Sequence, residues 1–167
     1  MNRFERQYIL TGFGIDGQRK LKQASVLLVG AGGLGCPALL YLAAAGVGKI
    51  GVIDGDIVSI SNLNRQVLFG ENDLGKNKAE QAVRRLQEQY SDISWEVYPE
   101  FLTVQNAQDL IANYDLIVDG TDNFPTRYLI NDACVLHGKP FVFGAIYQHE
   151  GQVSVFNLGE NSCTYRD

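Results

Sequence analysis

The chain has 167 residues, of which 46% are hydrophobic and 20% are charged, and its formal net charge is −5. This length fits one globular domain with enough apolar surface for a core. The acidic balance argues against a nucleic-acid partner, because such binding needs Lys and Arg clustered on one face. The longest mostly apolar run, residues 37–47, is shorter than the roughly 20 residues that span a bilayer, so no membrane partner is expected.

The start of the chain and its cysteines indicate where the protein works. No apolar stretch typical of a secretory signal follows Met1. Cys36, Cys134 and Cys163 are an odd set without Cys-x-x-Cys spacing, which predicts neither a disulfide framework nor a self-contained zinc site. We therefore expect a cytoplasmic protein with reduced thiols. Cys36 and Cys134 are interpreted as core residues, although a helix dipole at Cys36 is an alternative that lowers the pKa of its thiol.

Short β-rich runs alternate with stretches of helical period along the chain. The expected elements, in chain order, are helices at 2–8 and 16–23, a strand at 26–29, a helix at 33–45, a strand at 50–53, a helix at 78–90, a strand at 94–98, a helix at 104–112, a strand at 116–118, a helix at 124–137, and strands at 141–145 and 152–156. The pattern predicts an α/β fold: a Rossmann-like, doubly wound, mostly parallel sheet with helices on both faces after an N-terminal helical preamble. A short polar turn before the last strand predicts an antiparallel C-terminal edge.

Helix ends are predicted from capping residues. Gly46 stands where the helix at 33–45 needs a left-handed stop. Thr103 is the expected N-cap of the next-to-last helix, and the pair Asp122–Asn123 is expected to cap the last one.

A glycine-rich loop joins the first strand to a helix in the sequence Gly30-Ala31-Gly32-Gly33-Leu34-Gly35. Gly30 permits the tight turn, Gly32 lets backbone N–H groups approach a phosphate, and Gly35 lets helix and strand pack closely. The next strand ends on Asp54, at the position whose carboxylate bonds a ribose hydroxyl in such folds. The loop therefore predicts a nucleotide site, with NAD and ATP both open as the ligand.

Polar and charged groups elsewhere favour ATP with Mg²⁺ over NAD. They lie in Asp54-Gly55-Asp56, in Ser61-Asn62-Leu63-Asn64-Arg65-Gln66, in Gly75-Lys76-Asn77-Lys78 and in Gly120-Thr121-Asp122-Asn123. These segments follow strands or begin helices, which is the edge of a doubly wound sheet where ligands bind. Nucleotidyl transfer needs cations and a metal near phosphates, whereas hydride transfer needs a nicotinamide pocket.

The sequence resembles the ThiF/MoeB/HesA family, the bacterial relatives of ubiquitin-activating enzymes, over nearly its whole length. The matching stretches are Arg3-Phe4-Glu5-Arg6-Gln7, the loop from Val29 to Gly35, Asp54-x-Asp56, Ser61 to Gln66, Gly75 to Lys78, Thr121-Asp122-Asn123 and Gly151-Gln152-Val153. The resemblance implies an adenylyltransferase in which the terminal glycine carboxylate of a ubiquitin-like sulfur carrier ending in Gly-Gly attacks the α-phosphate of ATP. Thiamine or molybdopterin synthesis is the implied pathway.

The same resemblance assigns roles to individual residues. Asp54 would hold the ribose, Asn62, Arg65 and Lys78 would contact ribose and phosphates, and Asp122 would bind Mg²⁺. Arg6 would reach the site of a neighbouring subunit, which implies a homodimer. The full expected set is Gly30, Gly32, Gly33, Gly35, Asp54, Asp56, Asn62, Arg65, Gln66 and Lys78 for nucleotide binding, and Arg65, Lys78, Asp122 and Arg6 for catalysis.

The C-terminal residues differ from the family pattern. When Tyr165-Arg166 is matched to the family's Cys-Tyr-Arg-Cys, Thr164 and Asp167 take the cysteine places, so no structural zinc is expected. Residues 1–167 are expected to be the ATP-binding adenylation domain of a protein that continues further in other family members. Two alternatives stay open: an NAD-dependent oxidoreductase on the same glycine loop, and a non-catalytic scaffold that docks a carrier.

Overall fold

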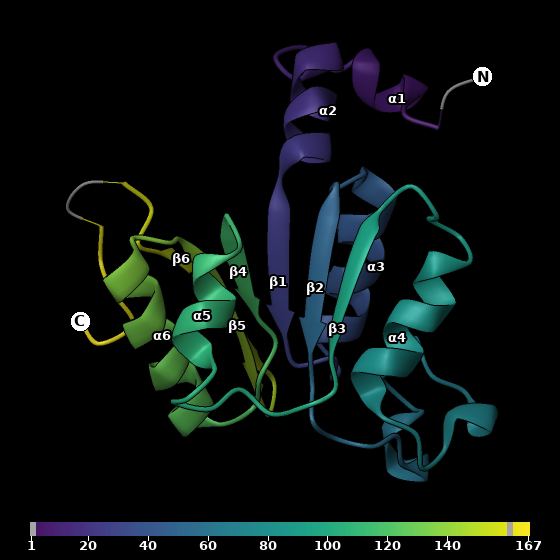
Figure 1. The fold of residues 1–167 in the computed structure, drawn as a ribbon, viewed down its shortest axis with the longest axis vertical. Helices are drawn as coiled ribbons and strands as arrows, with labels where there is room; N and C mark the ends of the chain where they lie inside the picture. Colours follow the sequence, from purple (N-terminus) through teal and green to yellow (C-terminus); the bar gives the residue numbers. More distant parts are fainter. Residues whose placement is uncertain (1–2, 160–161) are drawn as a thin grey trace.

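A single six-stranded sheet organises the residues that the computed structural model describes, 3–159 and 162–167 (Figure 1). Its strand order is β3-β2-β1-β4-β5-β6, and the first five of these strands are parallel. The last, β6, pairs antiparallel with β5. The expected Rossmann-like sheet with an antiparallel C-terminal edge is confirmed.

The elements correspond to those expected from the sequence, with small shifts at their ends. The strands are β1 (Ser25–Val29), β2 (Lys49–Ile53), β3 (Ser94–Tyr98), β4 (Leu116–Asp119), β5 (Phe141–Tyr147) and β6 (Glu150–Phe156). The helices are α1 (Glu5–Tyr8), α2 (Gly14–Gln23), α3 (Gly35–Ala45), α4 (Lys78–Gln87), α5 (Ala107–Ala112) and α6 (Phe124–His137), with short 3₁₀ turns η1 (Ile60–Asn62) and η2 (Glu71–Asp73). The expected start of the first helix at Asn2 lies outside the described residues.

Two hydrophobic cores cover the two faces of the sheet. In β1, Val26 and Leu28 belong to the core shared with α3 and α4, whereas Leu27 and Val29 belong to the core shared with α5 and α6. This alternation follows from the two-residue period of a strand, and all four side chains are apolar because both faces are covered. The sheet is therefore doubly wound, as predicted.

The helical preamble, α1 and α2, lies beyond the end of the sheet at which the parallel strands begin (Figure 1). Gln18 attaches α2 to the body of the protein, because its Nε2 donates to the carbonyl of Ala45 at 2.9 Å. Gly46 follows α3 with a φ of 89°, the left-handed stop that the sequence predicted.

Two capping predictions need correction. The side chain of Thr103 does not cap α5, which begins at Ala107; instead the Asn106 Oδ1 accepts the Thr103 N–H at 2.7 Å, so the intervening residues form a turn. At α6 the cap is Asn123 alone, whose Oδ1 accepts the N–H of Thr126 at 3.0 Å. The carboxylate of Asp122 is therefore left out of the capping of α6.

Besides α5, and α1, which begins at Glu5 after a turn, two helices are shorter than expected. The helix expected from residue 33 begins at Gly35, because the chain needs residues 30–34 to turn out of β1. The helix expected to reach residue 90 ends at Gln87 and continues as a turn. Among the residues described, none of the helices combines the length and the apolar character needed to cross a membrane.

Candidate nucleotide-binding site

A cavity of about 880 Å³ opens at the carboxyl ends of the parallel strands. It collects side chains from the loops after β1, β2, β3 and β4, from α4 and α6, and from β5. Its lining includes Gly30, Gly32, Gly33, Asp54, Asp56, Arg65, Gln66, Lys78, Phe101, Thr121, Asp122, Arg127, Phe143, Tyr147 and Tyr165. The strand order reverses between β1 and β4, so the cavity lies at the topological switch point where open α/β sheets bind ligands.

The glycine loop forms the floor of the cavity where β1 meets α3. Gly30 has a φ of 89°, a conformation that L side chains rarely adopt. At Gly35, a Cβ atom would stand 1.9 Å from the carbonyl oxygen of Gly30, which leaves no room for a side chain. Gly32 and Gly33 line the cavity itself. The two structural roles that the sequence assigned to Gly30 and Gly35 agree with this geometry.

Asp54 ties the glycine loop to the loop after β2. One carboxylate oxygen accepts the N–H of Ala31 and the other accepts the N–H of Asp56, both at 2.8 Å. Burial raises the pKa of Asp54, and these two hydrogen bonds and the charge of Lys78 partly oppose that rise. Asp54 thus lines the cavity with its carboxylate held in one orientation by backbone groups.

Lys78 brings a buried ammonium group to the part of the cavity next to Asp54 and Asp56. It is the first residue of α4, its side chain is only 8% exposed, and its Nζ donates to the Asp56 Oδ2 at 2.9 Å. Asn77 caps α4 and donates from its Nδ2 to the carbonyl of Asp54 at 2.8 Å. The start of α4 is therefore attached to the loop after β2, which aims the ammonium group into the cavity.

Arg65 and Gln66 complete this wall from the loop that follows η1. The Arg65 Nη1 donates to the carbonyl of Ser61 at 2.9 Å, and its aliphatic stem lies beside Gly33. Gln66 is buried, and its Oε1 has no hydrogen-bond partner among the described residues. A buried acceptor without a partner next to a cavity is free to bind a donor on a ligand. We call the wall formed by Gly30, Asp54, Arg65 and Lys78 the glycine-loop side.

Two aspartates at the end of β4 have opposite surroundings. Asp119 is buried: its Oδ1 accepts the N–H and the hydroxyl of Thr121 at 2.9 and 2.7 Å, and its Oδ2 has no partner among the described residues. Burial raises the pKa of Asp119. Asp122 is exposed to the cavity, and in the described part of the chain its carboxylate makes no hydrogen bond or ion pair. Asp122 is thus the carboxylate available to a cation.

Three of the expected site residues do not line the cavity. Asn62 directs its Oδ1 to the N–H of Ser59 at 3.1 Å and closes the η1 turn. Gly35 lies beneath the loop. Arg6 belongs to α1, at the opposite end of the sheet from the cavity in Figure 1. Their predicted roles toward a nucleotide stay predictions.

Sequence reasoning missed several residues of the opposite wall. We call this wall the α6 side and define it by Arg127, Phe143 and Tyr165, which all line the cavity. Arg127 lies in the first turn of the predicted last helix, and its place just after Thr121-Asp122-Asn123 was a signal that it faces the same sheet edge. Tyr165 had no such signal, because packing on Phe143 with ring centroids 5.0 Å apart brings it there from a distant part of the chain.

The cysteines take no part in the site. Burial raises the pKa of the Cys36 thiol to about 11, and Cys36 donates to the carbonyl of Ala31 at 3.3 Å. Burial likewise raises the pKa of Cys134 to about 12. The interpretation of both as core residues is confirmed, and the alternative of a low-pKa thiol at Cys36 is wrong because desolvation dominates.

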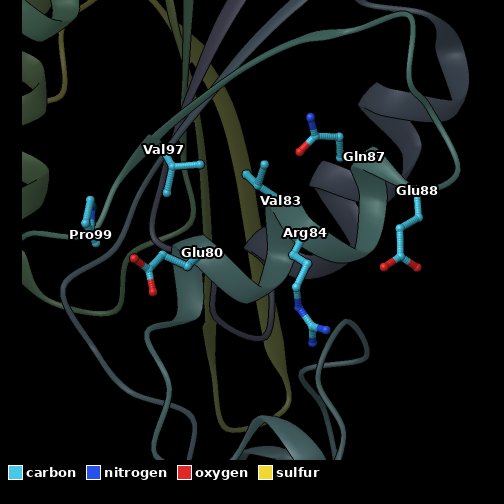
Figure 2. Close-up of a pocket in the computed structure, with 7 residues that line it drawn as sticks. All are labelled: Glu80, Val83, Arg84, Gln87, Glu88, Val97 and Pro99. Carbon is cyan, nitrogen blue, oxygen red and sulfur yellow. The ribbon is translucent and has the colours of Figure 1, made fainter.

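A second, more open hollow lies between α4 and β3, as Figure 2 shows. Val83 and Val97 lie in it, with Glu80, Arg84 and Glu88 around them. It contains none of the predicted site residues, so the candidate site is the cavity at the switch point.

Comparison with known proteins shows the family of the chain. The model of the ThiF family matches residues 4–167. The chain belongs to the ThiF family. A sulfur carrier protein adenylyltransferase from Thermus thermophilus is 56% identical over 99% of the chain. An adenylyltransferase and sulfurtransferase, MOCS3, from Culex quinquefasciatus is 52% identical over 96% of it. The family that the sequence resembles is therefore confirmed.

A solved structure of a ThiF-like protein extends the agreement to three dimensions. The crystal structure of Escherichia coli MccB with AMPCPP and MccA superposes with a TM-score of 0.85, covers 98% of this chain and is 31% identical. The chain spans only 63% of the Thermus relative, 37% of the Culex relative and 50% of the MccB chain. It thus corresponds to one part of these longer ThiF-family proteins.

Proposed function

We propose that this chain is the nucleotide-binding part of an adenylyltransferase that uses ATP and Mg²⁺ to activate the terminal glycine carboxylate of a ubiquitin-like sulfur carrier. One observation carries the proposal: a single cavity at the switch point collects the glycine loop, Asp54, Arg65, Lys78 and Asp122. The names of the relatives and the AMPCPP in the MccB structure support the same activity. The pathway, thiamine or molybdopterin synthesis, belongs to this proposal.

The residues divide the work of nucleotidyl transfer between them. The backbone N–H groups of the glycine loop and the N-terminus of α3 attract phosphate oxygens. Lys78 and Arg65 stabilise negative charge that moves from the α-phosphate to the departing pyrophosphate, because both are cations held in place before the substrate arrives. Asp54 accepts a hydrogen bond from the ribose. The reaction needs no protein nucleophile.

Mg²⁺ fits the residues present, judged by the chemistry of Asp122. Mg²⁺ binds through one or two carboxylates plus the substrate phosphates, and the Asp122 carboxylate faces the cavity without a competing partner among the described residues. When bound, Mg²⁺ supplies neutralisation of phosphate charge. Asp119 is unsuited to replace Asp122, because burial encloses its carboxylate behind Thr121.

The proposal includes a homodimer in which Arg6 serves the neighbouring site. In its own chain Arg6 is exposed on α1, at the opposite end of the sheet from the cavity (Figure 1). A role in catalysis therefore requires the cavity of a second copy. A cytoplasmic location, expected from the sequence, is part of the same proposal.

The test is ATP–pyrophosphate exchange with a Gly-Gly-ending carrier, using the full-length protein. Exchange that depends on the carrier supports the proposal, and exchange that persists when the Gly-Gly tail is deleted contradicts it. The two alternatives give different results. A non-catalytic scaffold binds the carrier without exchange, and an oxidoreductase binds NAD in a way that ATP with Mg²⁺ does not compete.

A further inference from the structure

The α6 side of the cavity differs chemically from the glycine-loop side. Aromatic rings dominate it, with Phe124, Phe143, Tyr147 and Tyr165 in the lining. Arg127 is the only cation among the described residues that line this side. Arg127 is half-buried, and its Nε is fully buried. A guanidinium placed among aromatic rings at the edge of a binding cavity is well suited to bind an anion there.

The guanidinium of Arg127 is held in one orientation. Its Nη2 donates to the carbonyl of Thr121 at 2.9 Å, and its Cζ lies 5.2 Å from the centre of the Phe143 ring and 5.6 Å from that of Phe124. Thr121 is itself fixed by two hydrogen bonds to the Oδ1 of Asp119. A cation positioned in this way loses little side-chain freedom when it binds a planar anion.

Arg127 also lacks an anionic partner within the described part of the chain. No ion pair joins Arg127 to a carboxylate of the described residues. Its buried Nε has no hydrogen-bond partner either. The charge of Arg127 acts on Asp119, whose pKa it lowers against the larger effect of burial, but the two side chains do not pair. The guanidinium of Arg127 can therefore bind an anion that enters the cavity.

We propose that Arg127 binds the terminal carboxylate of the acceptor chain and positions it for attack on the α-phosphate. This inference rests on the proposed function. The groups suited to phosphates, Arg65 and Lys78, lie on the glycine-loop side, whereas Arg127 lies on the α6 side. The strand β4 separates β1 from β5 in the sheet. The anion left for Arg127 is the carboxylate, to which a guanidinium donates a charge-assisted hydrogen bond.

The reaction balances without any further reagent. One carboxylate oxygen forms a bond to the α-phosphorus, and the bond from that phosphorus to the oxygen of the pyrophosphate breaks. The electron pair leaves with pyrophosphate, and no proton moves. Arg127 holds the second carboxylate oxygen, which lowers the repulsion between two anions that must approach each other.

The test uses a short synthetic peptide ending in Gly-Gly as the free carboxylate and as the C-terminal amide, measured by calorimetry in the presence of AMPCPP and Mg²⁺. The wild-type protein is expected to bind the carboxylate about 30-fold more tightly than the amide, since loss of one partner of a hydrogen-bonded charge pair costs about that much. Arg127→Gln is expected to remove the preference while AMPCPP affinity stays within about twofold. Arg19→Gln, an exposed arginine of α2, is the matched control.

The outcomes separate the two proposals. Equal binding of the two peptides by the wild-type protein, or binding of neither, overturns the role of Arg127, as does an unchanged preference in Arg127→Gln. Failure of the wild-type protein to bind AMPCPP overturns the proposed function instead. If Arg127→Gln does not fold, phenylglyoxal labelling of the wild-type protein decides: Arg127 is expected to be protected by the carboxylate peptide and not by the amide, and equal labelling contradicts the inference.

Discussion

The two sides of the cavity are built in different ways. On the glycine-loop side, each charged group is held by neighbours in short, recognisable segments, as Asp54 is by Ala31 and Asp56, and Lys78 by Asp56. On the α6 side, Arg127 is oriented by aromatic rings, and Tyr165 is brought in by packing. The residues of the first side stand in recognisable sequence motifs, although contacts between distant segments join these motifs, whereas no motif marks Tyr165 on the second side. Substitutions on the glycine-loop side should therefore lower exchange or nucleotide binding, whereas those on the α6 side should weaken packing and binding of the carboxylate peptide.

The largest effect is expected at Asp122, where the two sides meet. Asp122→Ala should lower carrier-dependent pyrophosphate exchange by about 1000-fold, because it removes the carboxylate that faces the phosphates and a metal. The melting temperature should stay unchanged, since this carboxylate makes no hydrogen bond or ion pair among the described residues. Asp16→Ala on α2 is the matched control. Exchange within a few-fold of wild type would show that another group binds the metal.

Substitutions of Lys78 and of its ion-pair partner Asp56 show which group of the glycine-loop side acts on the substrate. Lys78→Met should lower exchange by about 100-fold through loss of a fixed cation near the phosphates. Asp56→Asn should lower it only a few-fold, because Asp56 is 57% exposed and only orients the ammonium. Steady-state exchange and AMPCPP binding measure both variants. Equal losses would mean that the ion pair, not the ammonium, is required.

Substitutions of two glycines in the same loop should have different effects, one on the stability of the fold and the other on nucleotide affinity. Gly35→Ala should destabilise the protein by about 3 kcal/mol in urea denaturation, since its Cβ would meet the Gly30 carbonyl at 1.9 Å. In Gly32→Ala, the added Cβ would lie 3.8 Å from the Gln66 Nε2, which is ordinary van der Waals contact. The stability of this variant should change little, while its affinity for AMPCPP falls, because the methyl group stands where a phosphate approaches. A stable Gly35→Ala variant would contradict the close packing of α3 on β1.

Tyr165 tests the dependence of the α6 side on packing. Tyr165→Ala should destabilise the protein by about 2 kcal/mol and weaken binding of the carboxylate peptide, because the ring packs on Phe143, Phe156 and Tyr128. Tyr165→Phe should behave like wild type, because no hydrogen bond of the hydroxyl is present among the described residues. Chemical denaturation and peptide calorimetry measure the two effects. Weaker AMPCPP binding in Tyr165→Ala would show that the two sides are not independent.

The smallest effect is a pH dependence at the C-terminal segment. Arg166 donates to both carboxylate oxygens of Asp132 at 2.6 Å, and this holds the pKa of Asp132 below its ordinary value. A lowered pKa in the folded state stabilises the contact fully above the ordinary value of 3.8, and the stabilisation is lost as the pH falls through the lower, folded value.

NMR of the Arg166 side chain and of the Tyr165 amide should follow this loss below pH 3.8. In Asp132→Asn the same signals should not titrate. A transition that survives in Asp132→Asn would assign the pH dependence to another carboxylate.

Most of the fold and the glycine-loop side could be predicted from the sequence, for identifiable reasons. The period of the apolar residues located all six strands, and the length of α6 was predicted to the residue, because Asn123 caps it and Gly138 ends it. The start of α5 was missed, since residues 104–106 form a turn in which the Asn106 Oδ1 accepts the Thr103 N–H, and the helix begins only at Ala107. The predicted nucleotide contact of Asn62 is untested, and its side chain bonds Ser59 in the structure.

By itself the sequence determined the family, the order of elements and a nucleotide site at the carboxyl ends of the strands, because these depend on periodicity and on short motifs. Only the tertiary structure decided which carboxylate at the end of β4 is open to a cation, since burial distinguishes Asp119 from Asp122. It also decided that Arg127 and Tyr165 face the same cavity. The placement of Tyr165 depends on the packing of the C-terminal segment against α6 and β5, which no local pattern records.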